Sequence, residues 1–80
     1  MIYRVLWSPY AEKRLEAILR DRLSHFELAA AAREIDRQLM VQPLQFGESR
    51  YDSVRIGFIR PLGVQFDVRT VIVDDVWRIE

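Results

Sequence analysis

The chain has 80 residues, of which 50% are hydrophobic and 30% are charged, and twelve basic residues balance twelve acidic ones. This composition is typical of one small folded domain, and it excludes a second domain or a large cofactor-binding fold. Apolar runs fall far short of the roughly 20 residues of a membrane span, and the absence of cysteine excludes disulfides and thiolate chemistry.

The opening residues Met1 to Arg4 are not typical of a signal peptide, because a basic segment followed by a long apolar run is missing. One histidine without cysteine excludes the usual structural zinc sites. We therefore expect a cytoplasmic protein with neither a metal nor a cofactor.

The N-terminal residues predict a strand followed by a helix. Ile2 to Trp7 alternates in polarity and is rich in strand-forming residues. Ser8 and Pro9 form a strong helix start, because the hydroxyl accepts a hydrogen bond from an unpaired N–H and proline loses none there. We expect this helix to run to about Leu23. Its predicted apolar face consists of Leu15, Ile18, Leu19 and Leu23.

A second helix is predicted from His25 to Val41. Ser24 and Glu27 fit a capping box at its start. Pro43 disfavours helical geometry at the residue before it, so the helix should end there. The predicted buried stripe consists of Leu28, Ala32, Ile35 and Leu39.

The solvent side of this helix carries Glu34, which is expected to pair with Gln38 or Arg37. A loop from Leu44 to Ser49 should follow the helix.

Beyond the loop the hydrophobic period changes from 3.6 to 2, which predicts three consecutive strands. Pro61 to Gly63 should form the first turn. The second connection, Arg69-Thr70, lacks the Gly or Asn of tight hairpins. Either that turn is longer than two residues, or Asp67 to Thr70 forms it at the expense of the strand. The last strand should run from Val71 to Ile79.

Alternation along these strands predicts a covered and an open face. The covered face is expected to hold Val54, Ile56, Phe58, Val64, Phe66 and Val68, and one face of the last strand Val71, Val73 and Trp77. The open face is expected to present Arg55, Gln65 and Asp67, joined by Asp74 and Arg78.

The predicted element order is β-α-α-β-β-β in one α+β domain covering residues 1–80. Three consecutive strands favour an antiparallel meander, and the two-helix hairpin must then pack on one face of this curved sheet.

Several segments resemble the RelE/ParE toxin superfamily. Tyr3-Arg4-Val5-Leu6-Trp7-Ser8-Pro9-x-Ala11-Glu12 looks like its opening strand, Ser/Thr-Pro cap and Ala-containing helix. Ala32-x-x-Ile35-Asp36-x-x-Leu39, with Pro43 and Gly47 before Arg50, is similar to its second helix and the following loop. Leu62 to Val68 and Val71 to Trp77 would be its last two strands. The order and spacing of these short motifs carry the resemblance across nearly the whole chain.

The resemblance implies the toxin half of a bacterial type II toxin–antitoxin pair. One branch of the superfamily cuts mRNA in the ribosome and the other poisons DNA gyrase, so the ribosome or gyrase is the implied target. The implied partner is a cognate antitoxin, which wraps the toxin with a segment that folds on binding. No membrane partner is expected. A homodimer is a further expectation, because an open sheet has strand edges that can pair.

The chemistry of the nuclease branch is not reproduced in this sequence. Cleavage by a 2′-hydroxyl needs an acid, a base and cations on the developing phosphorane charge. In the branch that cleaves RNA, the resemblance places an Arg where Gly63 stands, and a Tyr or His near the chain end, where Val76 to Glu80 has neither. We therefore predict no catalytic residue and a ParE-like action by protein contact.

Five residues are candidates for contact with an anion or a partner. They are Arg50, Arg55, Arg60, Arg78 and Trp77. The first three arginines would form a stripe towards an anionic partner, and the alternative is surface pairing with Glu48, Asp52 or Asp67. Trp77 lies near the chain end, where a large ring often anchors a partner.

Other residues are better explained by structure. His25 is expected to be a solvent-exposed residue at a helix start rather than a general base. Asp74 and Asp75 are adjacent, so a turn or bulge is expected rather than a shared-proton pair. The spacing of most aromatic residues is typical of a core rather than of base stacking. These aromatic residues are Tyr3, Trp7, Phe58 and Phe66.

Three functions remain open. The leading one is a toxin-like module that binds protein. The second is a ribosome-dependent mRNA endonuclease, with Arg50, Arg55 and Arg78 on phosphate and His25 or a water as base. The third is an orphan domain that keeps the fold as a structural or homodimerising unit.

Overall fold

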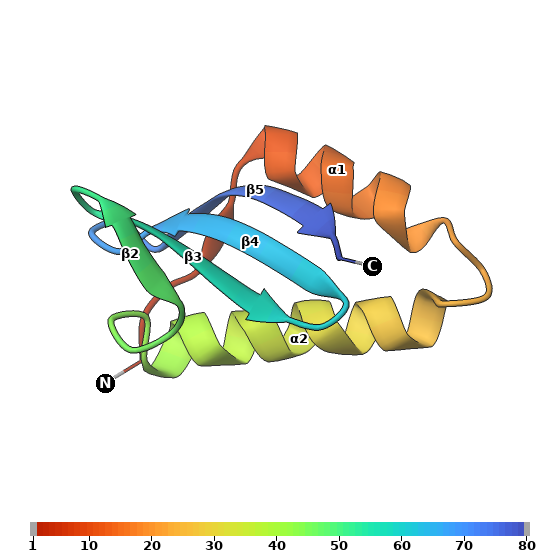
Figure 1. Cartoon of the computed structure of the whole chain (residues 1–80), viewed down its shortest axis with the longest axis horizontal. Coiled ribbons are helices and arrows are strands. Elements are labelled where there is room, and N and C mark those ends of the chain that lie inside the picture. Colours follow the sequence, from red (N-terminus) through yellow and green to blue (C-terminus); the bar gives the residue numbers. More distant parts are fainter. Residues whose placement is uncertain (1, 80) are drawn as a thin grey trace.

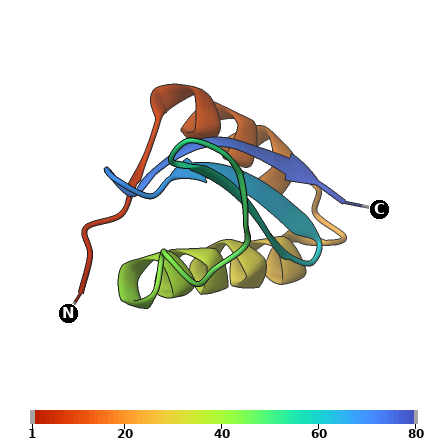
Figure 2. The ribbon, with the colours of Figure 1, turned by 60° about the vertical axis from the view of Figure 1, so that its left-hand side comes forward.

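The computed structural model describes residues 2–79 and has α+β architecture, with two helices packed on a five-stranded sheet. The elements are β1 (Leu6–Trp7), α1 (Pro9–Leu19), α2 (His25–Val41), β2 (Glu48–Tyr51), β3 (Val54–Ile59), β4 (Leu62–Asp67) and β5 (Ile72–Arg78). Figures 1 and 2 show α1 running beside β5, and a loop joining the helices at the end of the molecule away from the N-terminus. The predicted fold class is confirmed.

The strand order of the sheet is β1-β5-β4-β3-β2. The last four strands in the sequence form the antiparallel meander, and β1 is parallel to β5 at one edge. The strand β2 lies partly in the predicted loop and was not expected. The strand expected at Ile2 to Trp7 is reduced to β1, because the preceding segment turns to α2, where Tyr3 N donates to Met40 O at 2.7 Å.

The buried core joins the helices to one face of the sheet. Its members are Ala11, Leu28, Ala31, Ile35, Leu39, Phe46, Leu62, Val64, Phe66, Val71, Val73 and Val76. The limits predicted for α2 are confirmed, and so is its stripe, except that Ala31 is buried and Ala32 only partly so. On the outer side Glu34 accepts hydrogen bonds from both Arg37 and Gln38, as expected.

The corner between the helices differs from the prediction. α1 ends at Leu19, and Leu23 is 99% exposed. Leu23 N donates to Asp21 Oδ1 at 3.1 Å, a local side-chain turn that competes with further helix. The predicted capping box is wrong, because Ser24 makes no side-chain cap bond and its Oγ accepts from Arg78 Nη2 at 3.1 Å instead.

The register of β3 against β4 reverses the predicted faces of β3. Arg55 lies opposite Phe66 and Gly57 lies opposite Val64, so these residues share the covered face. The apolar set expected inside (Val54, Ile56 and Phe58) therefore lies on the open face. The reason is the turn: β4 already begins at Leu62, and a one-residue shift in pairing moves every side chain to the other face.

A β-bulge in β5 moves Trp77 to the open face. Gln65 pairs with Asp75 and Phe66 with Val73, which leaves Asp74 as the extra residue. The predicted bulge or turn at the adjacent aspartates is confirmed. Because of it Val73 and Val76 are both buried, and Trp77 lies on the face opposite Val73, contrary to the prediction.

The β4–β5 turn is longer than two residues, which is the first of the two alternatives predicted for this connection. β4 ends at Asp67 and β5 begins at Ile72, with Val71 at a φ of 53°.

Candidate contact face

The side of the sheet away from the helices forms a face that we call the open face. Cross-strand pairing assigns to it Val54, Ile56, Phe58, Gly63, Gln65, Asp67 and Trp77. Each alternates with a residue that points into the core, so the order of apolar and polar residues along β3, β4 and β5 determines its chemistry. Its centre is apolar and aromatic rather than cationic.

The Trp77 ring lies over Gly63. A Cβ atom at Gly63 would be 2.6 Å from both Cε2 and Nε1 of that ring. Phe58 packs against the same ring edge-to-face, with centroids 6.2 Å apart and planes at 80°. Phe58 is nevertheless 51% exposed, so the expectation that it belongs to the core is wrong. The two rings together form an aromatic surface at the centre of the open face.

Two carboxylates lie at the other end of the β4–β5 pair. Asp67 accepts from Arg69 N at 2.8 Å and from Ser53 Oγ at 2.9 Å, and these bonds lower its pKa. Partial burial, and then the nearby Asp67 charge, raise the pKa of Asp74. Arg69 Nε also lies 3.9 Å from Asp67 Oδ1, so the polar part of this region is mixed in sign. It lacks the concentrated positive charge that favours binding of a polyanion.

The four candidate arginines do not gather at one site. Arg55 is half-buried and donates to Phe46 O at 3.0 Å and to Gly47 O at 2.6 Å, which ties β3 to the loop after α2. Arg78 pairs with Asp21 at 2.5 Å and so lowers the pKa of that carboxyl. Arg50 lies on the exposed strand β2, and Arg60 in the β3–β4 turn.

The alternative for three of these arginines, pairing with surface carboxylates, is not seen either. Within residues 2–79 no ion pair joins Arg50, Arg55 or Arg60 to an acidic group. Arg55 uses backbone carbonyls in place of a carboxylate.

His25 is the exposed first residue of α2, as expected. Its Nδ1 lies 2.9 Å from Leu19 O, and because a carbonyl only accepts, this nitrogen donates. Of the remaining aromatic residues, Phe66 is fully buried, and Tyr3 and Trp7 pack against the core. Trp7 Nε1 also donates to Asp36 Oδ1 at 2.8 Å.

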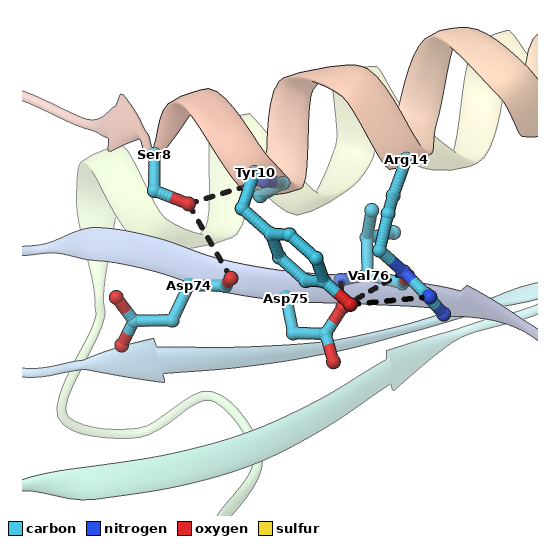
Figure 3. A network of polar contacts seen from close by, with 7 residues as sticks. Ser8, Tyr10, Arg14, Asp74, Asp75 and Val76 are labelled. Carbon is cyan, nitrogen blue, oxygen red and sulfur yellow. Dashed lines mark hydrogen bonds and ion pairs between the residues drawn. The ribbon is translucent and has the colours of Figure 1, made fainter.

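The free edge of β5 is covered by α1. β1 pairs with only the first two residues of β5, which leaves the backbone from Asp74 to Val76 without a neighbouring strand on that side. Figure 3 shows the side chains that replace that strand. Ser8 Oγ donates to Asp74 O at 3.3 Å and Arg14 Nε donates to Val76 O at 2.9 Å.

The same edge holds an ion pair. Arg14 Nε is 3.0 Å from Asp75 Oδ1, and that oxygen also accepts from Val76 N at 2.8 Å. Tyr10 completes the network, since Arg14 Nη1 donates to its hydroxyl at 3.3 Å. Satisfied edge groups of this kind protect a sheet from pairing with another strand.

Comparisons with known proteins do not identify a family: neither protein-family models nor curated proteins match this sequence. Across the described residues no group of His, Cys, Asp and Glu is placed to hold a metal ion. In that same part of the chain, no helix has both the length and the apolar character needed to span a membrane.

Proposed function

We propose that this protein acts by protein contact through the open face, as the toxin-like member of a bacterial type II toxin–antitoxin pair of the RelE/ParE kind. The observation that carries the proposal is the Trp77 ring over Gly63, at the place where the resemblance sets an arginine in the nuclease branch. A large ring at the centre of a face suits a protein partner, because such rings dominate binding energy when buried.

The distribution of charge also supports contact over cleavage. An RNA-binding surface gains affinity from clustered cations that release counterions. Here Arg55 and Arg78 are engaged with Phe46 O, Gly47 O and Asp21, and Asp67 lies on the open face. The proposed partners are a cognate antitoxin and a cytoplasmic target, with Trp77 and Phe58 as anchors for one or both.

Co-expression with the product of a neighbouring short reading frame tests the proposal. We expect the two proteins to co-purify, and Trp77→Ala to weaken the complex by about 30-fold or more, as for a central hot-spot residue. Phe26→Ala is the matched control, because Phe26 is also an exposed aromatic residue but lies at the start of α2. It should leave the affinity unchanged.

Two results would contradict this function. One is a harmless protein that binds no such product. The other is cleavage of translated mRNA, measured by primer extension, that is lost in Arg55→Ala, which would favour the endonuclease instead.

A further inference from the structure

The two edges of the sheet differ in how they are protected. On the β5 side, β1 is only two residues long, and Ser8 and Arg14 bind the backbone beyond it. On the other side β2 is the last strand of the sheet and pairs with β3 alone (Figure 1). Within residues 2–79 no hydrogen bond outside the β2–β3 pairing involves the backbone of β2. The outer side of this strand is therefore open to a further strand.

The strand β2 carries one acidic and one basic side chain at the rim of the open face. All of its residues are exposed. Glu48 lies opposite Ile56, and Arg50 shares the place opposite Val54 with Tyr51, because the register against β3 shifts there. Among the described residues neither Glu48 nor Arg50 forms an ion pair. Two opposite charges thus stand two positions apart without partners in their own chain.

A second copy of β2 would pair with both charges. Two identical antiparallel strands are related by a twofold axis, so positions equally far from the axis lie opposite each other. With the axis at Ser49, Glu48 of each copy lies opposite Arg50 of the other, which gives two pairs of opposite charge. With the axis at Arg50, Glu48 would instead lie opposite Asp52 and Arg50 opposite itself. The order of charges along β2 therefore favours the register centred on Ser49.

We propose that this chain forms a twofold dimer in which the β2 strands of two copies pair antiparallel, centred on Ser49. The two sheets then join into one, with both open faces on the same side, because the axis of such a pair is perpendicular to the sheet. The aromatic centres around Trp77 stay uncovered. Since β2 is short and irregular in register, the contact is small and the dimer is weak. The dimer does not rest on the proposed function.

Cysteine cross-linking tests the register, because the chain has no cysteine of its own. In the proposed dimer the two Ser49 Cα atoms lie about 4.5–5.5 Å apart, a distance that a disulfide spans. The two Glu48 positions, like the two Arg50 positions, are diagonal neighbours about 7–8 Å apart, which is too far without backbone movement.

Under mild oxidation we expect Ser49→Cys to form a disulfide-linked dimer about tenfold faster or more than Glu48→Cys or Arg50→Cys alone. A mixture of Glu48→Cys and Arg50→Cys should cross-link the two variants to each other, because these positions lie opposite each other across the axis.

Sedimentation of the full chain at concentrations up to about 1 mM measures the association itself, since contacts of this size give weak complexes. We expect Glu48→Arg and Arg50→Glu each to raise the dissociation constant about fivefold or more, because like charges then lie opposite each other. An equimolar mixture of the two variants should associate again, since all facing charges are then opposite. The matched controls are Glu16→Arg and Arg33→Glu on the helices, which are also exposed and should dimerise like the parent chain.

The substituted positions are exposed, and circular dichroism verifies that each variant is folded. A parent chain that stays monomeric throughout would overturn the dimer and leave the β2 edge to a different occupant. Cross-linking of Ser49→Cys no faster than that of Glu48→Cys, or charge reversals without effect, would equally overturn it. Failure to co-purify with the product of a neighbouring reading frame would instead contradict the proposed function and leave this dimer untouched.

Discussion

Gly63 lies within a regular strand, where the backbone itself does not require a glycine. The side chain of Trp77, which lies over this position, explains why a glycine is needed there. The Trp77 ring occupies the space that a Cβ would need. The bulge at Asp74 brings Trp77 to this face, and the register with Phe58 places a second ring beside it. Gly63, which leaves room for the ring, and Asp74, the extra residue of the bulge, thus together produce the aromatic centre of the open face.

Replacing Gly63 by alanine should therefore displace the Trp77 ring. We expect Gly63→Ala to lower the free energy of unfolding by about 1–3 kcal/mol, the usual cost of overpacking. In a Trp77→Ala background the same substitution should cost clearly less, because the obstructing ring is gone. Urea unfolding of the four chains gives the coupling between the two positions. Equal costs in both backgrounds would show that the ring does not require the glycine.

Two aspartates on neighbouring strands should respond to pH with opposite sign. The pKa of Asp74 is raised, so its ionisation destabilises the fold as pH rises through that pKa. The pKa of Asp67 is lowered, so its ionised form adds stability that is lost as pH falls from its ordinary value of 3.8.

We expect Asp74→Asn to raise the melting temperature at pH 7 and to bring no gain at pH 3, where the native carboxyl is protonated. Asp67→Ala should instead lower the melting temperature at pH 7, and by less at acid pH. Thermal unfolding over this range measures both. A gain from Asp74→Asn that does not depend on pH would mean that charge is not its cause.

At the scale of elements, α1 is held by its first turns. Ser8 caps the helix by accepting from Ala11 N at 3.1 Å, and its hydroxyl also reaches Asp74 O. Two turns further on, Arg14 binds the edge of β5. By contrast α2 starts at Ser24 without a side-chain cap and is held by its buried stripe.

The two serines before the helices should therefore differ in importance. Ser8→Ala is expected to cost about 1 kcal/mol of stability, as is typical of a lost N-cap. Ser24→Ala should stay within about 0.5 kcal/mol, because it loses only an exposed contact with Arg78. Chemical denaturation compares the two variants directly. A larger loss of stability in Ser24→Ala would contradict this expectation and would support the capping box that the sequence predicted there.

Removing the guanidinium that covers the β5 edge should weaken the fold. Arg14→Met keeps much of the aliphatic stem but removes the donor to Val76 O and the cation paired with Asp75. We expect a loss of about 1 kcal/mol. Lys13→Met is the control, since the neighbouring Lys13 is exposed and lacks this contact. If both variants unfold at the same denaturant concentration, the network adds nothing to stability.

For the whole molecule, the division into a helical layer and a sheet separates two surfaces. The open face carries aromatic residues, whereas the groove between the helices is lined by acidic and basic side chains together, namely Glu12, Glu16, Arg33 and Asp36. Association through the aromatic centre of the open face should therefore depend little on salt.

Features that depend on neighbours along the chain could be predicted from the sequence. The 3.6 and 2 periods predicted two helices and a sheet, Ser8-Pro9 located the start of α1, and Pro43 marked the end of α2. The adjacent aspartates predicted the bulge in β5. These signals rest on local hydrogen bonds, dihedral preferences and amphipathic spacing, all of which act within a few residues.

Which face each strand presents, and what each charged side chain binds, depends instead on how the elements pack in three dimensions. The parallel pairing of β1, the addition of β2 and the one-residue shift of β3 against β4 depend on segments far apart in the chain. Alternation states that side chains point to opposite faces but not which face is buried, so Trp77 and Phe58 could not be placed in advance. The arginines were likewise ambiguous, because a long cationic side chain binds whatever carbonyl or carboxylate the fold brings within its reach.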